Sequence, residues 1–104
     1  MASNKLSMAG LAVRAGKAVF GTAACEKGIK KRTIKLLLLQ KGLSDSSVNH
    51  FFMLCKTADV NMLMVDEDER LGDAVGRPEI MVLGITDKRF AEQIKYNIVG
   101  GSGI

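Results

Sequence analysis

Hydrophobic residues follow two alternating patterns along this chain. Residues 17–20, 34–39, 61–65 and 80–85 form short, mostly apolar runs of the length of a β-strand. Residues 4–15 and the stretches after the later runs instead place apolar side chains three or four positions apart, on one face of a helix. Strands that alternate with helices, and are apolar on both faces, predict an α/β protein. We expect a three-layer α/β/α sandwich around a mixed four-stranded sheet.

Short oxygen-bearing side chains mark where the predicted helices begin, because they accept hydrogen bonds from the free N–H groups of a first turn. Thr22 is predicted to cap the second helix, Ser44 the third and Thr86 the last. Asp66 and Glu69 have the spacing of a capping box, which predicts the start of a short fourth helix. The inward stripe of the third helix is expected to consist of Val48, Phe51, Phe52 and Cys55.

A glycine-lysine pair near the amino terminus raises the question of a nucleotide-binding P-loop. That loop has four residues between its glycines and a Ser or Thr after the lysine. Here five residues separate Gly10 from Gly16, and Ala18 follows Lys17. The intervening residues have helical spacing, so Gly16 is predicted to terminate the first helix.

The composition fits one ordinary globular domain of 104 residues, with 47% hydrophobic and 25% charged residues. We expect this domain to span residues 1–98 and a flexible tail to occupy residues 99–104. The sequence has no apolar run of membrane-spanning length and no secretory signal, and its two cysteines lack metal-ligand spacing. These features predict a cytoplasmic monomer with no membrane partner, no bound metal and no cofactor.

The net charge of +4 is unevenly distributed. The segment from Arg14 to Lys35 contains seven cations and one anion, Glu26, so that it carries +6 and the remaining residues carry −2. A basic third on a slightly acidic body is expected of a protein that presents one face to a polyanion. A solvated lysine-rich helix face would give the same distribution.

Catalytic chemistry has little support in the sequence. The single histidine, His50, is predicted to face solvent, and Cys25 is predicted to lie on the apolar side of the second helix. The acidic run 66–69 is explained by the attraction of acids to a helix amino terminus. We therefore expect a protein that is not an enzyme.

The second helix has a core side and an outward, lysine-rich side. At 100° per residue, Gly28 and Ile29 cluster with Cys25, whereas Ala23 and Ala24 face outward with the lysines. Free N–H groups beside two small side chains make the start of this helix a suitable phosphate site. The phosphate contacts are expected to come from Arg14, Lys17, Lys27, Lys30 and Lys31, converging on that end.

Two motifs resemble those of a known family. Gly21-Thr22, followed by Lys27 and a basic Lys31, resembles the G-T-N-E-x-x-K segment of the kink-turn RNA-binding ribosomal proteins, the seven-A-e and thirty-e type of large-subunit proteins. The segment LGDAVG at residues 71–76 is similar to the second signature of that family, L-G-x-A-x-G. The stretches LAVRAGKAVFG and ITDKRFAEQI resemble the bacterial YlxQ-like branch, and the whole resemblance covers residues 6–95.

The resemblance implies a non-catalytic cytoplasmic protein that grips a sharply bent RNA. In such proteins the start of the second helix enters the kink, and the loop after the second signature closes over a flipped-out base. The implied partners are structured RNA, with ribosomal RNA among the candidates, and other ribosomal proteins. The expected RNA-binding residues are Gly21, Thr22, Ala23, Ala24, Lys27, Lys30, Lys31, Arg14, Lys17, Arg77, Pro78 and Glu79.

One departure from the family pattern leaves alternatives open. The Asn-Glu pair of the family, which bonds to guanines, is replaced here by Ala23-Ala24, whose side chains neither donate nor accept hydrogen bonds. Phosphate positioning is compatible with this change, whereas strict kink-turn selectivity depends on the missing pair. A protein–protein adaptor that keeps the fold is the main alternative. A small enzyme that uses an anion at the helix start is the third.

Overall fold

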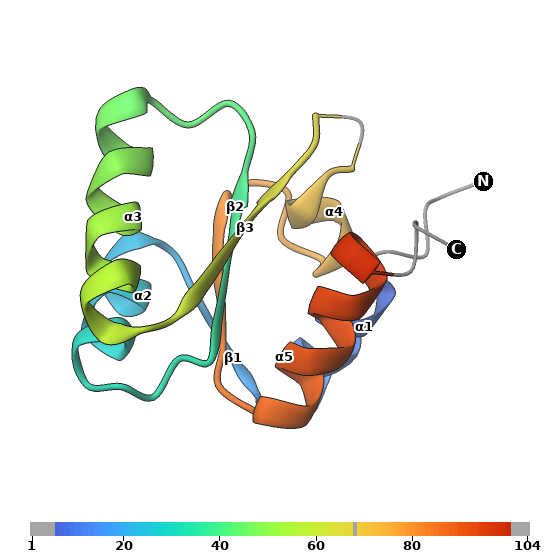
Figure 1. Ribbon diagram of the computed structural model, residues 1–104. Coiled ribbons are helices and arrows are strands. Elements are labelled where there is room, and N and C mark those ends of the chain that lie inside the picture. The colour runs from blue at the N-terminus through green and yellow to red at the C-terminus, as the bar shows by residue number, and fades with distance from the viewer. Residues whose placement is uncertain (1–5, 68, 101–104) are drawn as a thin grey trace.

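A four-stranded sheet forms the middle layer of the protein, with helices against both faces (Figure 1). The computed structural model describes residues 6–67 and 69–100. The strands are β1 (Ala18–Phe20), β2 (Leu36–Gln40), β3 (Asn61–Val65) and β4 (Val82–Ile85). The helices are α1 (Ser7–Arg14), α2 (Thr22–Lys30), α3 (Asp45–Ala58), α4 (Leu71–Ala74), α5 (Lys88–Lys95) and the π-helix η1 (Tyr96–Gly100). The predicted three-layer sandwich is confirmed.

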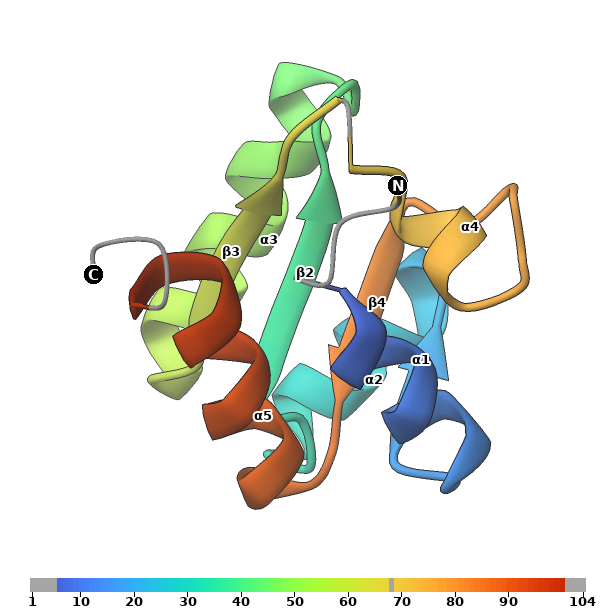
Figure 2. The same cartoon turned by 90° about the vertical axis from the view of Figure 1, so that its right-hand side faces the viewer.

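The strands lie in the order β1-β4-β2-β3. β2 and β3 are parallel, and β4 is antiparallel to both β1 and β2. Because of this, β1, β2 and β3 all point in one direction, and their last residues meet at one end of the sheet. We call this the carboxyl end, which is the upper end in Figures 1 and 2, and the opposite one the amino end.

The leucine run of β2 supplies side chains to two separate cores. Leu36 and Leu38 pack on the side of α1, α4 and α5, and Leu37 and Leu39 on the side of α2 and α3. All four are at most 1% exposed. Helices on both faces of the sheet therefore explain the unbroken apolar run, because successive side chains of a strand point to opposite faces.

Two of the predicted N-caps are displaced by one residue. Ser44 caps α3 as predicted, since its Oγ accepts from the Ser47 N–H at 3.2 Å. Thr22, however, is the first residue of α2, and no side chain caps that helix. Thr86 does not cap α5 either, because the Asp87 carboxylate accepts from the Phe90 N–H at 3.0 Å.

The predicted capping box of the fourth helix is wrong. Glu69 donates its backbone N–H to the Asp66 carbonyl in a turn, and α4 begins only at Leu71. The Leu71 N–H is bonded instead by the side chain of Gln40, which lies 31 residues away in the sequence. The capping-box pattern assigned an acidic side chain as the hydrogen-bond acceptor at the start of α4. The acceptor is instead the side chain of Gln40, the last residue of β2.

Further differences concern side-chain burial and element boundaries. Phe51 and Cys55 are buried, but Phe52 is 49% exposed, because neighbouring helix positions point 100° apart. Three of the four strands begin one or two residues later than predicted. The helix η1 extends to Gly100, past the expected domain boundary at residue 98, and the remaining tail at 101–104 lies outside the described residues.

Candidate functional site

The carboxyl end of the sheet brings together segments that are far apart in the sequence. α2, α3 and α4 all begin there, each shortly after the strand that precedes it (Figure 1). Residues 76–81 form the loop that leads from α4 into β4, at the same end. In open α/β sheets, ligands bind where the carboxyl ends of parallel strands meet. This end is therefore the candidate functional site.

The start of α2 is held in place by backbone hydrogen bonds. Gly21, with φ of 85°, donates its N–H to the Val82 carbonyl at 3.0 Å and accepts from the Cys25 N–H at 3.0 Å. A positive φ favours glycine, which explains the residue at this turn. Ala23 and Ala24 are exposed, and no side chain caps the helix. The first-turn N–H groups can therefore bind an anion.

The 76–81 loop lies directly beside the start of α2. The Arg77 guanidinium stacks over the ring of Phe20, with Cζ 4.3 Å from the ring centroid. Phe20 is the last residue of β1 and immediately precedes the Gly21 turn. The two segments that carry the predicted motifs are thus in contact, and Phe20 is a site residue that sequence reasoning missed.

Gly72 allows the loop to approach α4 closely. A Cβ atom at Gly72 would overlap the Arg77 carbonyl oxygen and would lie 2.7 Å from the Pro78 carbonyl oxygen. The Arg77 N–H donates to the Gly72 carbonyl at 2.8 Å, and the Ile80 N–H donates to the Arg77 carbonyl at 2.9 Å. The first glycine of the LGDAVG segment therefore has a packing role, and the loop is held by its own backbone.

Gln40 connects three segments at this end of the sheet. Its Nε2 donates to the Val65 carbonyl at 3.2 Å and the Asp66 carbonyl at 2.9 Å, while its Oε1 accepts from the Leu71 N–H at 2.6 Å. The end of β2 thereby fixes the end of β3 and the start of α4. Nothing in the local sequence indicates this role, because every partner is at least 25 residues away.

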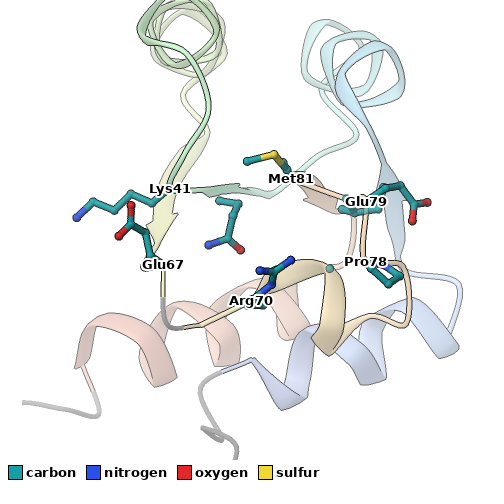
Figure 3. Close-up of a pocket in the computed structure, with 9 residues that line it drawn as sticks. Lys41, Glu67, Arg70, Pro78, Glu79 and Met81 are labelled. Atoms are coloured by element: carbon teal, nitrogen blue, oxygen red, sulfur yellow. The ribbon is translucent and has the colours of Figure 1, made fainter.

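A hollow of about 350 Å³ lies between β2, the start of α4 and the loop (Figure 3). Arg70 enters it from the side of α4, and Pro78 and Glu79 border it from the loop. Its two cations are engaged elsewhere, since Lys41 pairs with Asp66 and Arg70 with Asp73, both at 3.5 Å. The hollow is therefore of mixed charge. Its lining consists of Gln40, Lys41, Glu67, Arg70, Gly72, Pro78, Glu79, Ile80 and Met81.

On its other side, α2 faces α3 across a second hollow, of about 430 Å³. The hydroxyl groups of Thr22, Ser46 and Ser47 border this hollow. His50 Nε2 lies 2.5 Å from Glu26 Oε2 and links the two helices. His50 is exposed, as predicted, but the sequence did not indicate that it has a partner.

The predicted cations do not converge on the start of α2. Lys27 is exposed but lies in the last turn of α2, five residues after Thr22 and four residues before Lys31. Lys30 and Lys31 lie at the far end of α2, about 13 Å along the helix axis from its first residue at 1.5 Å per residue. Arg14 and Lys17 precede β1 and therefore lie at the amino end of the sheet. A helical wheel shows on which side of the helix each lysine lies, but not how far along the helix axis it lies.

The cysteines are structural. Cys25 and Cys55 are free thiols that are at most 2% exposed. Removal from water raises the pKa of Cys25 to about 12 and that of Cys55 to about 11. Neither thiol ionises readily, so neither is suited to act as a nucleophile. Within residues 6–67 and 69–100, no three His, Cys, Asp or Glu side chains are grouped so as to hold a metal, and no helix could span a membrane.

Two solved structures share this architecture. A protein of unknown function from Bacillus halodurans C is 25% identical, with a TM-score of 0.85 over 91% of this chain and 96% of that one. The Giardia lamblia 15.5 kD RNA binding protein is 14% identical, with a TM-score of 0.76 over 89% of this chain and 80% of that one. The latter likeness concerns the fold alone.

The sequence itself matches a family model over most of its length. No curated protein sequence matches the chain significantly. The model of the Ribosomal protein L7Ae/L30e/S12e/Gadd45 family, however, matches residues 5–95, which include both motifs and every segment of the candidate site. The predicted resemblance to ribosomal proteins of the seven-A-e and thirty-e type is confirmed, as is the expectation of a non-catalytic protein. The chain belongs to the Ribosomal protein L7Ae/L30e/S12e/Gadd45 family.

Proposed function

We propose that this protein binds structured RNA through the start of α2 and the 76–81 loop. The observation that carries the proposal is the contact between Arg77 and Phe20, which joins the two motif-bearing segments into one surface. Family membership supports it, as does the similar fold of a protein described as RNA-binding. Selectivity for a kinked RNA is part of the proposal, because α2 and the loop present their exposed residues at one end of the molecule.

The contacts proposed for this surface are mainly to phosphates. The first-turn N–H groups of α2 and the positive end of its dipole attract a phosphate, and Ala23 and Ala24 leave room for a close approach. Two exposed cations, Lys27 further along α2 and Arg77 in the loop, add positive charge. Because both alanines lack polar side-chain atoms, the bend of the RNA backbone, more than the identity of its bases, would be recognised.

The hollow beside the loop offers a place for an unstacked base. It is bordered by backbone and side-chain polar groups and by the apolar stems of Ile80 and Met81. The amide of Gln40 is fully used within the protein, so a ligand there would meet Glu79, and also Arg70 once it leaves its exposed ion pair with Asp73. Pro78 and Glu79 lie on the loop that would close over such a base.

Fluorescence anisotropy with a kink-turn RNA and with a plain RNA duplex tests the proposal. In the double variant Lys27→Gln/Arg77→Gln, affinity for the kinked RNA should fall at least about tenfold, since two phosphate contacts are lost. The matched control, Lys56→Gln/Lys95→Gln, removes the same charge from α3 and α5 and should retain most of the affinity. Unchanged binding in the first variant would refute the proposed surface.

A protein–protein adaptor is the second candidate, and one observation favours it. Phe52 and Met53 are 49% and 57% exposed on the outer side of α3, where large apolar side chains suit a protein partner. This function predicts a salt-tolerant protein complex and no nucleic acid in the purified protein. The absorbance ratio at 260 and 280 nm of freshly purified protein distinguishes the two candidates.

A further inference from the structure

Cations from several segments collect at the amino end of the sheet, opposite the proposed RNA-binding surface. The Thr86 N–H donates to the Lys17 carbonyl at 2.9 Å, and the Lys35 N–H donates to the Ile85 carbonyl at 2.7 Å. Lys17 and Lys35 therefore flank the end of β4, and Lys88 follows two residues after Thr86. Three exposed lysines from three separate parts of the sequence meet there.

The ends of two helices extend this group of cations. Lys30 and Lys31 are exposed at the end of α2, and Arg14 is exposed at the end of α1. Figures 1 and 2 show that α1 and α2 end, and α5 begins, at the lower end of the molecule. Arg32 turns the chain there with φ of 62°, and its guanidinium donates to the Ala58 carbonyl at 3.2 Å. We define the basic end as Arg14, Lys17, Lys30, Lys31, Lys35 and Lys88.

Most of these charges are not neutralised within the protein. Among the described residues, only Lys30 of the six forms an ion pair, with Glu26 at 4.0 Å, and its side chain remains 63% exposed. The carboxylate of Asp87, the nearest acid in sequence to Lys88, already caps α5. At the carboxyl end, by contrast, Lys41 and Arg70 both pair with acids. The positive charge of the molecule is thus concentrated away from the start of α2.

We propose that the basic end is a second RNA-contacting surface, which binds backbone phosphates without reading sequence. Separate exposed cations from several segments match a row of phosphates better than one small anion, because the hollow of about 300 Å³ that Lys35 and Lys88 line also contains the acid Glu92. A lipid surface fits less well. Among the described residues, these segments contribute one large exposed apolar side chain, Leu11 of α1 at 46% exposure, whereas membrane binding would require a continuous apolar face.

The inference rests on the proposed function, which supplies the ligand, RNA. It adds a second surface through which that RNA is held. The two surfaces lie at opposite ends of a molecule whose longest extent is 35 Å. The protein would therefore contact its RNA at both ends, through the start of α2 and through the basic end.

The double variant Lys17→Gln/Lys31→Gln tests the basic end, because both side chains are exposed and neither bonds to another side chain among the described residues. Its affinity for a plain RNA duplex should fall about tenfold near 0.1 M salt. The slope of log K against log[salt] should become less negative by about 1.8, or 0.9 per phosphate contact. Lys17→Arg/Lys31→Arg, which keeps both charges, should bind as the wild type does.

The control Lys41→Gln/Lys95→Gln removes the same net charge from the end of β2 and the last turn of α5, and it should change the slope by less than half as much. An equal loss in this control would overturn the proposal, because net charge alone would then explain the effect. Stronger binding to phosphatidylserine vesicles or to polyglutamate than to the duplex, lost in the same variant, would also overturn it.

The proposed function and the proposed basic end can be refuted separately. The ratio of affinities for kinked RNA and plain duplex reports on the start of α2, and it should be unchanged in the basic-end variant. A wild-type ratio near one would contradict the proposed function, whereas the duplex affinity and salt slope would still report on the basic end.

Discussion

The guanidinium of Arg77 lies over the ring of Phe20 at 4.3 Å, and this contact joins a loop to a strand that precedes it by more than 50 positions. Phe20 immediately precedes the turn into α2, and Arg77 follows the LGDAVG segment. The contact depends on the sheet order, because the loop leads into β4, and Phe20 of β1 pairs with Leu83 of β4. Two motifs that are separate in the sequence thereby form one surface.

Replacing the ring of Phe20 should loosen the loop. In a double-mutant cycle of Phe20→Leu and Arg77→Gln, urea unfolding should give a coupling energy of about 0.5 to 1 kcal/mol, as expected for an exposed cation–π contact. Phe52→Leu, at an exposed ring, should show no coupling to Arg77→Gln. Zero coupling between Phe20 and Arg77 would mean that the stacking does not hold the loop.

Adding a methyl group at Gly72 should displace the loop. The new Cβ of Gly72→Ala would collide with the Arg77 and Pro78 carbonyls, so stability should fall by about 1–3 kcal/mol. The Arg77 and Ile80 amides should also exchange faster with deuterium. Gly16→Ala serves as the control: its φ of 73° makes the change costly, but no atom lies within 4 Å of the added methyl. Protected loop amides in Gly72→Ala would contradict the packing role.

Removal of the Gln40 amide should destabilise the carboxyl end. Gln40→Ala leaves the Leu71 N–H and two carbonyls without this partner, so the free energy of unfolding should fall by about 1–3 kcal/mol. Gln93→Ala, which removes one exposed hydrogen bond to Asn97, should cost far less. The comparison is made by urea unfolding of both variants, and equal losses would exclude a special role for Gln40.

Stability should decline in alkali through the buried thiols. Burial raises the pKa values of Cys25 and Cys55 above the ordinary value of 9.0, to about 12 and about 11. Above pH 9 the unfolded chain therefore loses thiol protons that the folded chain keeps. The stability that the protonated thiols contribute is lost as the pH rises from 9 toward their pKa values in the folded protein. By pH 10 the loss should be about 1 kcal/mol per thiol.

The double variant Cys25→Ala/Cys55→Ala isolates this effect. The free energy of unfolding in urea is measured at pH 8 and pH 10 for each protein. Between these pH values it should fall less in the variant than in the wild type. Native thiols should also react slowly with a disulfide reagent at pH 8, and rapidly in urea. Fast reaction in the native protein would show that the thiols are accessible.

Local patterns identified most elements but misplaced some of their boundaries. Thr86 and Asp87 are both good caps, and the choice between them depends on which residue takes the extended backbone conformation before the helix. The turn before α2 requires a positive φ, which selects Gly21 as the cap position over Thr22. The capping pattern at Asp66 failed because Gln40, a distant residue, bonds the first N–H of α4.

The sequence by itself determined the layered fold, because burying a strand on both faces demands an unbroken apolar run such as Leu36–Leu39. It also identified the two motifs of the candidate site. Only the tertiary structure decided which residues share a surface. Sheet order brings Arg77 to Phe20, while the length of α2 separates Lys31 from the start of the helix and places it with Lys17 and Lys35 at the opposite end. Helical periodicity fixes the direction of a side chain around its axis, whereas the packing of whole elements fixes which ends meet.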